Sequence, residues 1–322
     1  MNEPKVVGLT PWLPWPFSRY PWWTQPVRAE RLAALRIGVA AVLLYDILGT
    51  YLPLVNDFFG RASLGSPEVF RPGLGTWYRW SLLRGVEDPR IFQGVFIIWA
   101  VAAAFLLVGA FTRVSAIIAW ALSISVMNIN YYLHNSGDNV RTITLFYLML
   151  CPCAAVWSLQ SCFGQRRAKE PGPVYIPPWP LRLLFVQLAL IYFLNGIYKV
   201  AGAEWREGQI MYSVLANLSW TRFSYAQLPL SPGLIQLMTW STLVFELGFP
   251  ILVMIPRVRT VTLWVGVLFH LGTGVLLQLG PFPLYMICLY LPLVPWEKYA
   301  DFVRRRSTQA IRAEQVSLAP SH

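Results

Sequence analysis

Long apolar runs dominate this chain and recur from near its start almost to its end. A helix needs roughly 20 apolar residues to cross a bilayer, and each run is about that long. The pattern therefore predicts eight membrane spans, at residues 32–52, 91–110, 114–133, 140–160, 180–199, 233–255, 260–279 and 281–296. The last run contains four prolines, so we expect it to be kinked or only partly spanning.

The fold class predicted from this pattern is all-α, a polytopic transmembrane helical bundle of about eight spans. Two connections on the predicted external side, residues 53–90 and 201–232, are long, apolar and aromatic, and we expect both to lie at the membrane interface. The chain divides into an N-terminal segment (1–31), a transmembrane domain (32–296) and a basic tail (297–322). No soluble domain is predicted.

Basic residues gather at the ends of the predicted spans, and the clusters lie on one side of the membrane. Arg28 and Arg31 precede the first span, Arg257 and Arg259 separate the sixth from the seventh, and Lys298 begins the tail. An excess of lysine and arginine marks the cytoplasmic side of a membrane protein. Both termini are therefore predicted to be cytoplasmic.

The composition supports the membrane assignment. Hydrophobic residues make up 56% of the chain and charged residues only 13%, which is typical of an integral membrane protein. The net charge of +11 comes from the clusters between spans, so we expect no nucleic-acid partner. We also expect no cleavable signal peptide. The four cysteines have no metal or disulfide spacing, and we assign them to packing.

Several ionisable residues fall inside the predicted spans, where their cost makes them functional candidates. Counting roughly 1.5 Å per residue places Lys199 at the external rim of span five and Asp46 in the external half of span one. The same count places His270 near the midplane of span seven and Glu246 in the cytoplasmic half of span six. The polar residues at the external start of span four are His134, Asn135, Asp138, Asn139 and Arg141.

Each candidate also has a purely structural interpretation. Lys199 can snorkel to the headgroups, and Asp138 and Asn139 can cap span four. Hydrogen bonds or ion pairs between helices would satisfy His270 and Glu246.

The functional hypothesis differs from these interpretations in the geometry that it predicts. Because the external polar residues share a depth, we expect them to converge in space. Lys199 should face a cavity, with His134, Asp138 or Arg141 near its mouth. A Lys199 side chain that points away from the bundle would favour snorkelling.

Four segments resemble a known family: "NGIYKVAGAEWREG", "YYLHNSGDNVRTITLFYLML", "FELGFP" and "LFHLGTGVLLQLGPFPLYM". Together they look like the horizontally transferred transmembrane (HTTM) domain family, which is related to vitamin K-dependent gamma-glutamyl carboxylase. The resemblance extends from about residue 33 to residue 296, with the motifs in the same order.

The resemblance implies a chemistry for the lysine. In the animal carboxylase, a lysine in a similar context is regarded as the base that deprotonates vitamin K hydroquinone and so allows oxygen to attack. Lys199 stands at the matching position, and His134 and His270 are the further catalytic candidates. We expect the surrounding polar residues to bind substrate: Asn135, Asp138, Asn139, Arg141, Trp205, Glu246 and Asp46.

The leading hypothesis is thus a lyase or oxidoreductase that uses a reduced quinone, with oxygen and carbon dioxide if it is a carboxylase, and no metal. Its partners would be the lipid bilayer and a small exported peptide, and its location the bacterial inner membrane. The chain lacks the large lumenal portion with which the carboxylase recognises its protein substrate. Two alternatives stay open: a non-catalytic partner in lipid or peptide handling or export, and a transporter, which is less favoured because no inverted repeat is evident.

Overall fold

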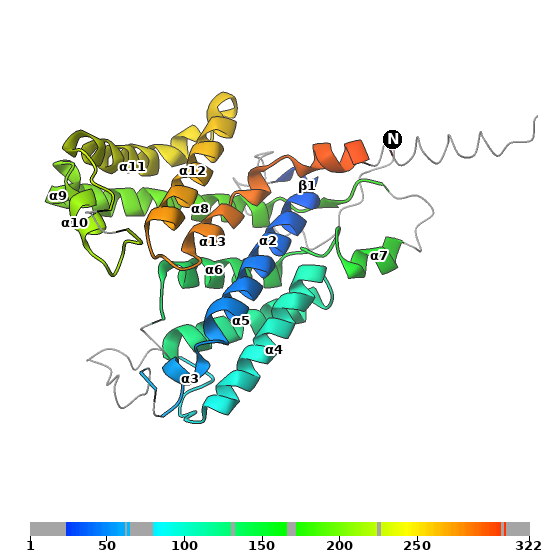
Figure 1. Cartoon of the computed structure of the whole chain (residues 1–322). Coiled ribbons are helices and arrows are strands. Elements are labelled where there is room, and N and C mark those ends of the chain that lie inside the picture. Colours follow the sequence, from blue (N-terminus) through cyan, green and yellow to red (C-terminus); the bar gives the residue numbers. More distant parts are fainter. Residues whose placement is uncertain are drawn as a thin grey trace, which may run out of the picture.

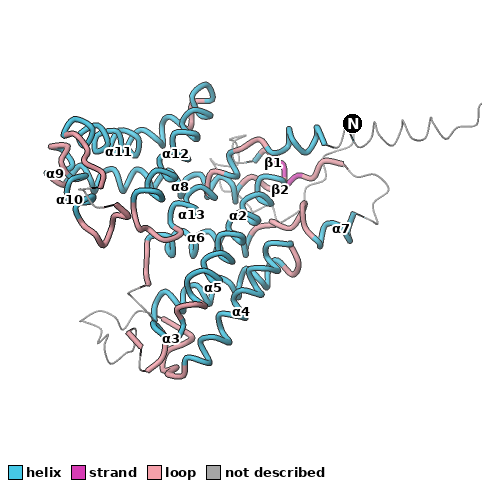
Figure 2. The backbone as a smooth tube through the Cα atoms, in the orientation of Figure 1, coloured by secondary structure: helices cyan, strands magenta, loops and turns pink. Residues whose placement is uncertain are grey.

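The computed structural model describes residues 24–61, 63–64, 80–129, 133–165, 172–223, 227–303 and 306. These residues form a helical bundle with one two-stranded antiparallel sheet (Figures 1 and 2). The elements are β1 (Val27–Arg28), α2 (Glu30–Asp46), its π-helical continuation η2 (Ile47–Tyr51), α3 (Val55–Phe58), α4 (Pro89–Val108), α5 (Thr112–Ile129), α6 (Ser136–Leu150), α7 (Leu159–Gln165), β2 (Tyr175–Ile176), α8 (Trp179–Ala201), α9 (Ala203–Arg206), α10 (Ile210–Ala216), α11 (Pro232–Leu252), α12 (Pro256–Leu276), α13 (Phe282–Cys288) and η4 (Leu291–Leu293).

The predicted all-α polytopic fold is confirmed. Six helical segments of the described chain are long and apolar enough to cross a membrane, namely α2 with η2, α4, α5, α8, α11 and α12. They coincide with six of the eight predicted spans. Of the two long external connections, 201–232 contains the short helices α9 and α10, whereas residues 62 and 65–79 of the connection 53–90 lie outside the described residues.

The other two predicted spans are shorter helices than expected. The run 140–160 is not one continuous helix, because α6 has 15 residues and ends at Leu150. Cys151 is extended, as is usual for a residue before proline, and Pro152 follows it. The run 281–296 forms only α13 and η4, since its prolines interrupt the helix.

The helices pack as two groups with a bridge between them (Figure 1). In the first group α2 packs on α4, and α5 packs on both α4 and α6. In the second group α8 packs on α11, and α11 contacts α12. The short helix α13 contacts α2 and α6 on one side and α12 on the other, so it joins the two groups.

Local capping residues define where α6 begins. The Asn135 side chain accepts a hydrogen bond from the backbone of Gly137 at 2.8 Å, and Asp138 accepts one from the backbone of Asn135 at 2.8 Å. This reciprocal pair is a capping box, which satisfies amide groups that the first turn leaves free. The structural interpretation of Asp138 as a capping residue is therefore confirmed.

A buried ion cluster ties the first group together. Arg141 on α6 is fully buried and lies 3.0 Å from a carboxylate oxygen of Asp46 on α2 and 2.8 Å from one of Asp138. Its guanidinium also lies over the ring of Trp99 on α4, 5.0 Å from the centroid. Tyr51 donates a hydrogen bond to Asp138 at 3.2 Å. The cluster therefore links α2, η2, α4 and α6 through charges that have no contact with solvent.

The two ends of the described chain meet at one end of the bundle. Arg28 contacts Asp301 at 2.9 Å, and Arg31 contacts Glu297 at 2.5 Å. Strand β1 pairs with β2 nearby, and Figure 1 shows β1 and α7 at the right, with α3, α9 and α10 at the left. This arrangement brings the residues before α2 and those after η4 to the same end of the bundle, whereas the two termini lie outside the described residues.

Thiol labelling tests which side that is. Cys162 on α7 is the exposed one of the four cysteines, all of which are free thiols. If α7 is cytoplasmic, an impermeant maleimide should label Cys162 in permeabilised cells but not in intact ones. A cysteine at the exposed Ser219, introduced in a Cys162→Ser background, should label in intact cells. The reverse pattern would contradict the predicted orientation.

Arg141→Met tests the ion cluster. Removing the cation leaves two buried carboxylates without compensation, so we expect the free energy of unfolding to fall by about 3–5 kcal/mol. The measurement is denaturant unfolding in detergent followed by tryptophan fluorescence. The matched control is Arg61→Met, since Arg61 is 68% exposed and pairs with Glu87 at 3.7 Å; we expect a loss of about 1 kcal/mol or less. Equal losses in the two variants would contradict the role of the cluster.

Candidate functional site

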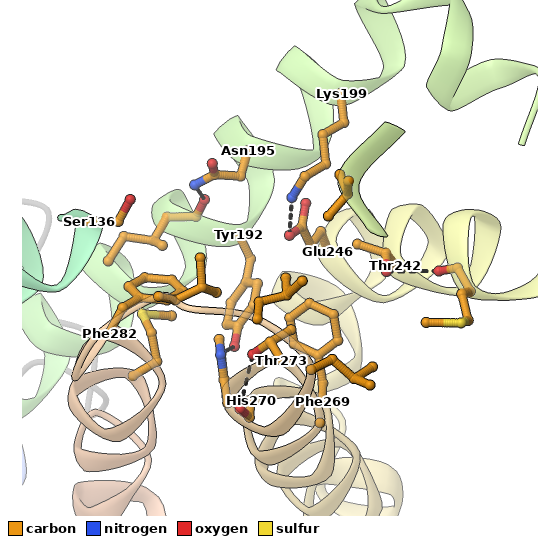
Figure 3. Close-up of a pocket in the computed structure, with 18 of the residues that line it drawn as sticks. Ser136, Tyr192, Asn195, Lys199, Thr242, Glu246, Phe269, His270, Thr273 and Phe282 are labelled. Atoms are coloured by element: carbon orange, nitrogen blue, oxygen red, sulfur yellow. Dashed lines mark hydrogen bonds and ion pairs between the residues drawn. The ribbon is translucent and has the colours of Figure 1, made fainter. Parts of the chain in front are cut away.

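A cavity of about 760 Å³ lies between the two helix groups. Residues of α6, α8, α11, α12 and α13 line it, and α9, α10 and the loop that follows α10 contribute Trp205, Leu215 and Trp220 (Figure 3). Most of the lining is apolar or aromatic. The connection 201–232, which was expected to lie at the interface, thus supplies part of a ligand-sized enclosure.

Lys199 points into this cavity and forms an ion pair there. Its amino group donates a hydrogen bond to Oε1 of Glu246 on α11, and it lies over the ring of Trp205, 5.2 Å from the centroid. Figure 3 shows the Lys199 side chain directed towards Glu246. The lysine is paired across two helices and does not point away from the bundle, which is the geometry that the functional hypothesis predicts.

Glu246 has spare hydrogen-bonding capacity. Its side chain is only 6% exposed. While Oε1 accepts from Lys199, Oε2 is buried and has no hydrogen-bond partner among the described residues. An unsatisfied buried carboxylate oxygen is costly. A buried acceptor without a partner among the described residues therefore lies on a cavity-lining residue, beside an amino group.

The contact between Lys199 and Glu246 corrects the predicted depths, which placed the two residues in opposite halves of the membrane. Gly196 lies against α11, where an added Cβ would be 2.8 Å from the Leu247 side chain and 3.3 Å from its backbone nitrogen. The small residue lets the two backbones approach closely. The prediction failed because it assumed that every span starts at the membrane surface, whereas α11 extends past the end of α8 to pack on α9 and α10.

A second polar group in the cavity is built on His270 of α12. Nε2 of His270 lies 2.6 Å from the hydroxyl of Tyr192, which also hydrogen-bonds to the hydroxyl of Tyr290. Gly266 makes room for this contact, because a Cβ there would lie 2.3 Å from the Tyr290 hydroxyl. Figure 3 shows Tyr192 reaching from α8 to His270. The result is a linear chain of three hydrogen-bonding side chains.

The predicted convergence of the external polar residues is met only in part. Asn139 and Ser136 of α6 line the cavity with Lys199, but His134, Asp138 and Arg141 are not among its lining residues. Asp138 and Arg141 belong instead to the ion cluster with Asp46 described above. Asn135 caps α6. The polar residues therefore divide between a structural cluster and the cavity.

The cavity residues Tyr192, Asn195 and Thr242, and Tyr290 behind them, were not singled out from the sequence. Tyr192, Asn195 and Lys199 follow one another at intervals of three and four residues, which places them on one face of α8. Thr242 and Glu246 share a face of α11 for the same reason. This spacing was a usable signal. Tyr290 carried no such signal, because it reaches Tyr192 only through tertiary packing.

The described residues contain no group of three or more His, Cys, Asp or Glu side chains that could hold a metal ion. The ionisable and acid–base groups among the lining residues are an amine, a carboxylate, an imidazole and a phenol. These groups can bind hydroxyl or carbonyl oxygens and can transfer protons.

Comparison with known proteins identifies the family. The model of the HTTM domain matches residues 24–295. No curated protein and no solved structure matches the chain. The matched region begins before α2 and ends after η4, so it includes every helix that lines the cavity. This integral, multi-pass membrane protein belongs to the HTTM domain family.

Proposed function

We propose that the protein is a membrane enzyme that binds a reduced quinone, or a similar lipophilic hydroxyl compound, in this cavity and removes a proton from it. The observation that carries the proposal is the ion pair between Lys199 and Glu246 inside an apolar, aromatic-lined cavity. A charge pair that served packing alone would not need a ligand-sized space beside it.

The residues present fit such a ligand. A volume of about 760 Å³ lies within the range of small-molecule sites, roughly 300–1,000 Å³. The rings of Trp205, Trp220, Phe269 and Phe282 line the cavity and can pack against an aromatic head group. Oε2 of Glu246, which has no hydrogen-bond partner among the described residues, can accept a hydrogen bond from a hydroxyl group.

Lys199 is the proposed base. In the ion pair its ammonium group donates to Oε1 of Glu246, so it must lose a proton before it can accept one. Oε1 is placed to take that proton along the existing hydrogen bond, which leaves a neutral amine. The amine then takes the proton of the ligand hydroxyl. The pair ends as an ammonium and a carboxylic acid, and the positive charge stays beside the negative oxygen of the ligand.

The proposed electron acceptor, coupled reaction and location rest on kinship with the carboxylase. When bound, a reduced quinone supplies an ionisable hydroxyl group and two electrons, which molecular oxygen accepts in the reaction that the kinship implies. The coupled reaction that we propose from this kinship is the addition of carbon dioxide to a small exported peptide. The proposed location is the bacterial inner membrane. His134 lies outside the cavity lining, so it has no role in this proposal.

Substitutions of Lys199 separate a base from a fixed positive charge. Lys199→Arg keeps the charge, but arginine stays protonated at neutral pH and cannot act as a base. We therefore expect both Lys199→Arg and Lys199→Ala to lower the rate of quinol oxidation by about 100-fold or more. The rate is measured as oxygen consumption by the purified protein in lipid nanodiscs.

The control for these variants is Lys298→Ala, which removes an exposed lysine at the opposite end of the bundle and should leave the rate unchanged. Near-normal turnover of Lys199→Arg would show that Lys199 is an electrostatic anchor. No quinol oxidation and no quinol binding by the unmodified protein would favour the non-catalytic role in lipid or peptide handling.

A further inference from the structure

Three arginines from three different helices gather at the end of the bundle where α2, α8 and α12 begin. They are Arg31 of α2, Arg182 of α8 and Arg259 of α12, and each is half-buried. Arg31 and Arg259 both contribute to the electrostatic field at Arg182, and both repel it. The fold therefore brings like charges together at this position, which we call the arginine cluster.

The backbone accounts for this convergence. Strand β1 leads into α2 and pairs with β2, which precedes α8, so the starts of these two helices are held together. Farther along α8, the Tyr192 hydroxyl lies 2.6 Å from Nε2 of His270 on α12. Arg182 precedes Tyr192, and Arg259 precedes His270, by roughly 15–17 Å of helix. The two arginines therefore occupy corresponding positions on α8 and α12.

The described acids at this end of the bundle are already paired. Glu30 and Asp301 both contact Arg28, at 2.7 and 2.9 Å, and Glu297 contacts Arg31 at 2.5 Å. Neither α8 nor α12 has an acidic residue in its first turn. The acids therefore stabilise Arg28 and Arg31 rather than the whole arginine cluster.

Arg259 is held by neutral groups. Its guanidinium donates to the backbone carbonyls of Val253 and Met254, at 2.8 and 3.4 Å. These bonds fix the side chain at the turn between α11 and α12, but a carbonyl carries no net charge. Among the described residues, no carboxylate forms an ion pair with Arg259. Its charge can therefore be compensated by an anion from outside the described protein.

We propose that the arginine cluster binds the phosphate of an anionic lipid headgroup, with Arg182 and Arg259 as the direct contacts. Both α8 and α12 are candidate membrane spans, so their first turns lie near the level of the bilayer phosphates. Guanidinium groups bind phosphate oxygens through paired hydrogen bonds, and basic sites between membrane helices recognise anionic lipids. The ammonium group of a zwitterionic lipid would be repelled by the three arginines. This inference is independent of the chemistry proposed for the cavity.

Membrane topology alone does not require this arrangement. Positive charge at one end of the spans orients a membrane protein, and exposed residues such as Arg257 and Lys298 supply it at this end. Topology sets no requirement for half-buried arginines on separate helices to face one another. A shared anionic ligand does, because it must be contacted from more than one helix.

Thermal unfolding with three different ligands tests the site. The purified protein in neutral detergent is heated with dioleoylphosphatidylglycerol, dioleoylphosphatidylcholine or inorganic phosphate, and tryptophan fluorescence gives the melting temperature. At about ten times the dissociation constant, set by titration, a bound ligand raises the melting temperature by about 3 °C or more. We expect this rise with phosphatidylglycerol and little change with the other two ligands.

Single variants assign the rise to the arginine cluster. Loss of one charged hydrogen bond weakens binding by roughly tenfold. At the same lipid concentration, Arg182→Gln and Arg259→Gln should each reduce the rise to about a third. Each rise is measured from the variant's own melting temperature without lipid, so a lower starting stability does not affect the comparison. If Arg259→Gln does not fold, Arg182→Gln still decides the outcome.

Arg257→Gln is the matched control. Arg257 is exposed, lies in the same part of α12 and carries the same charge, but residues two apart on a helix do not face the same side. This variant should keep the full rise. An equal loss in Arg257→Gln and Arg182→Gln would show general attraction to a basic surface and overturn the proposal. Equal stabilisation by phosphatidylcholine, stabilisation by inorganic phosphate alone, or no rise with phosphatidylglycerol would also overturn it, and none of these results bears on the proposed function.

Discussion

Pairing of buried charges is the constraint on which this structure depends. Hydrocarbon offers a charged side chain no hydration, so each one must find its partner inside the bundle. Arg141 meets that requirement with Asp46 and Asp138 and thereby fixes α2 against α6. Lys199 meets it with Glu246 and fixes the end of α8 on α11. The first pairing is closed on all sides, whereas the second opens onto a cavity.

The fold was predictable from the sequence because its strongest signal is the length of an apolar run. Six spans and their order followed directly from that signal. Helix ends were less predictable, because composition alone does not show where a proline stops a helix. The run 140–160 stays largely apolar past Cys151 and Pro152, but its helix ends at Leu150. Likewise, capping was only one of two interpretations of Asp138 until its hydrogen bond to the backbone of Asn135 was known.

The candidate site was predictable residue by residue but not as an arrangement. Lys199, Glu246, His270, Asn139 and Trp205 were all named from the sequence, and all line one cavity. Their grouping was not predictable, because it depends on the position of α11 along the axis of α8. The close contact between Gly196 and Leu247 belongs to that tertiary packing. For the same reason the sequence did not separate the cavity residues from the structural cluster around Arg141.

The shortness of α6 has a consequence for how a ligand arrives. Its 15 residues extend about 22 Å, some 8 Å less than a hydrocarbon core of about 30 Å. The first turn of α6, where Ser136 and Asn139 line the cavity, then lies below the level of the lipid headgroups when the other end of the helix lies at the opposite surface. In that position the proposed lipophilic ligand would diffuse in from the side along the acyl chains. Occupancy would follow the mole fraction of the ligand in the bilayer rather than its aqueous concentration, and it would change with the thickness of the lipids.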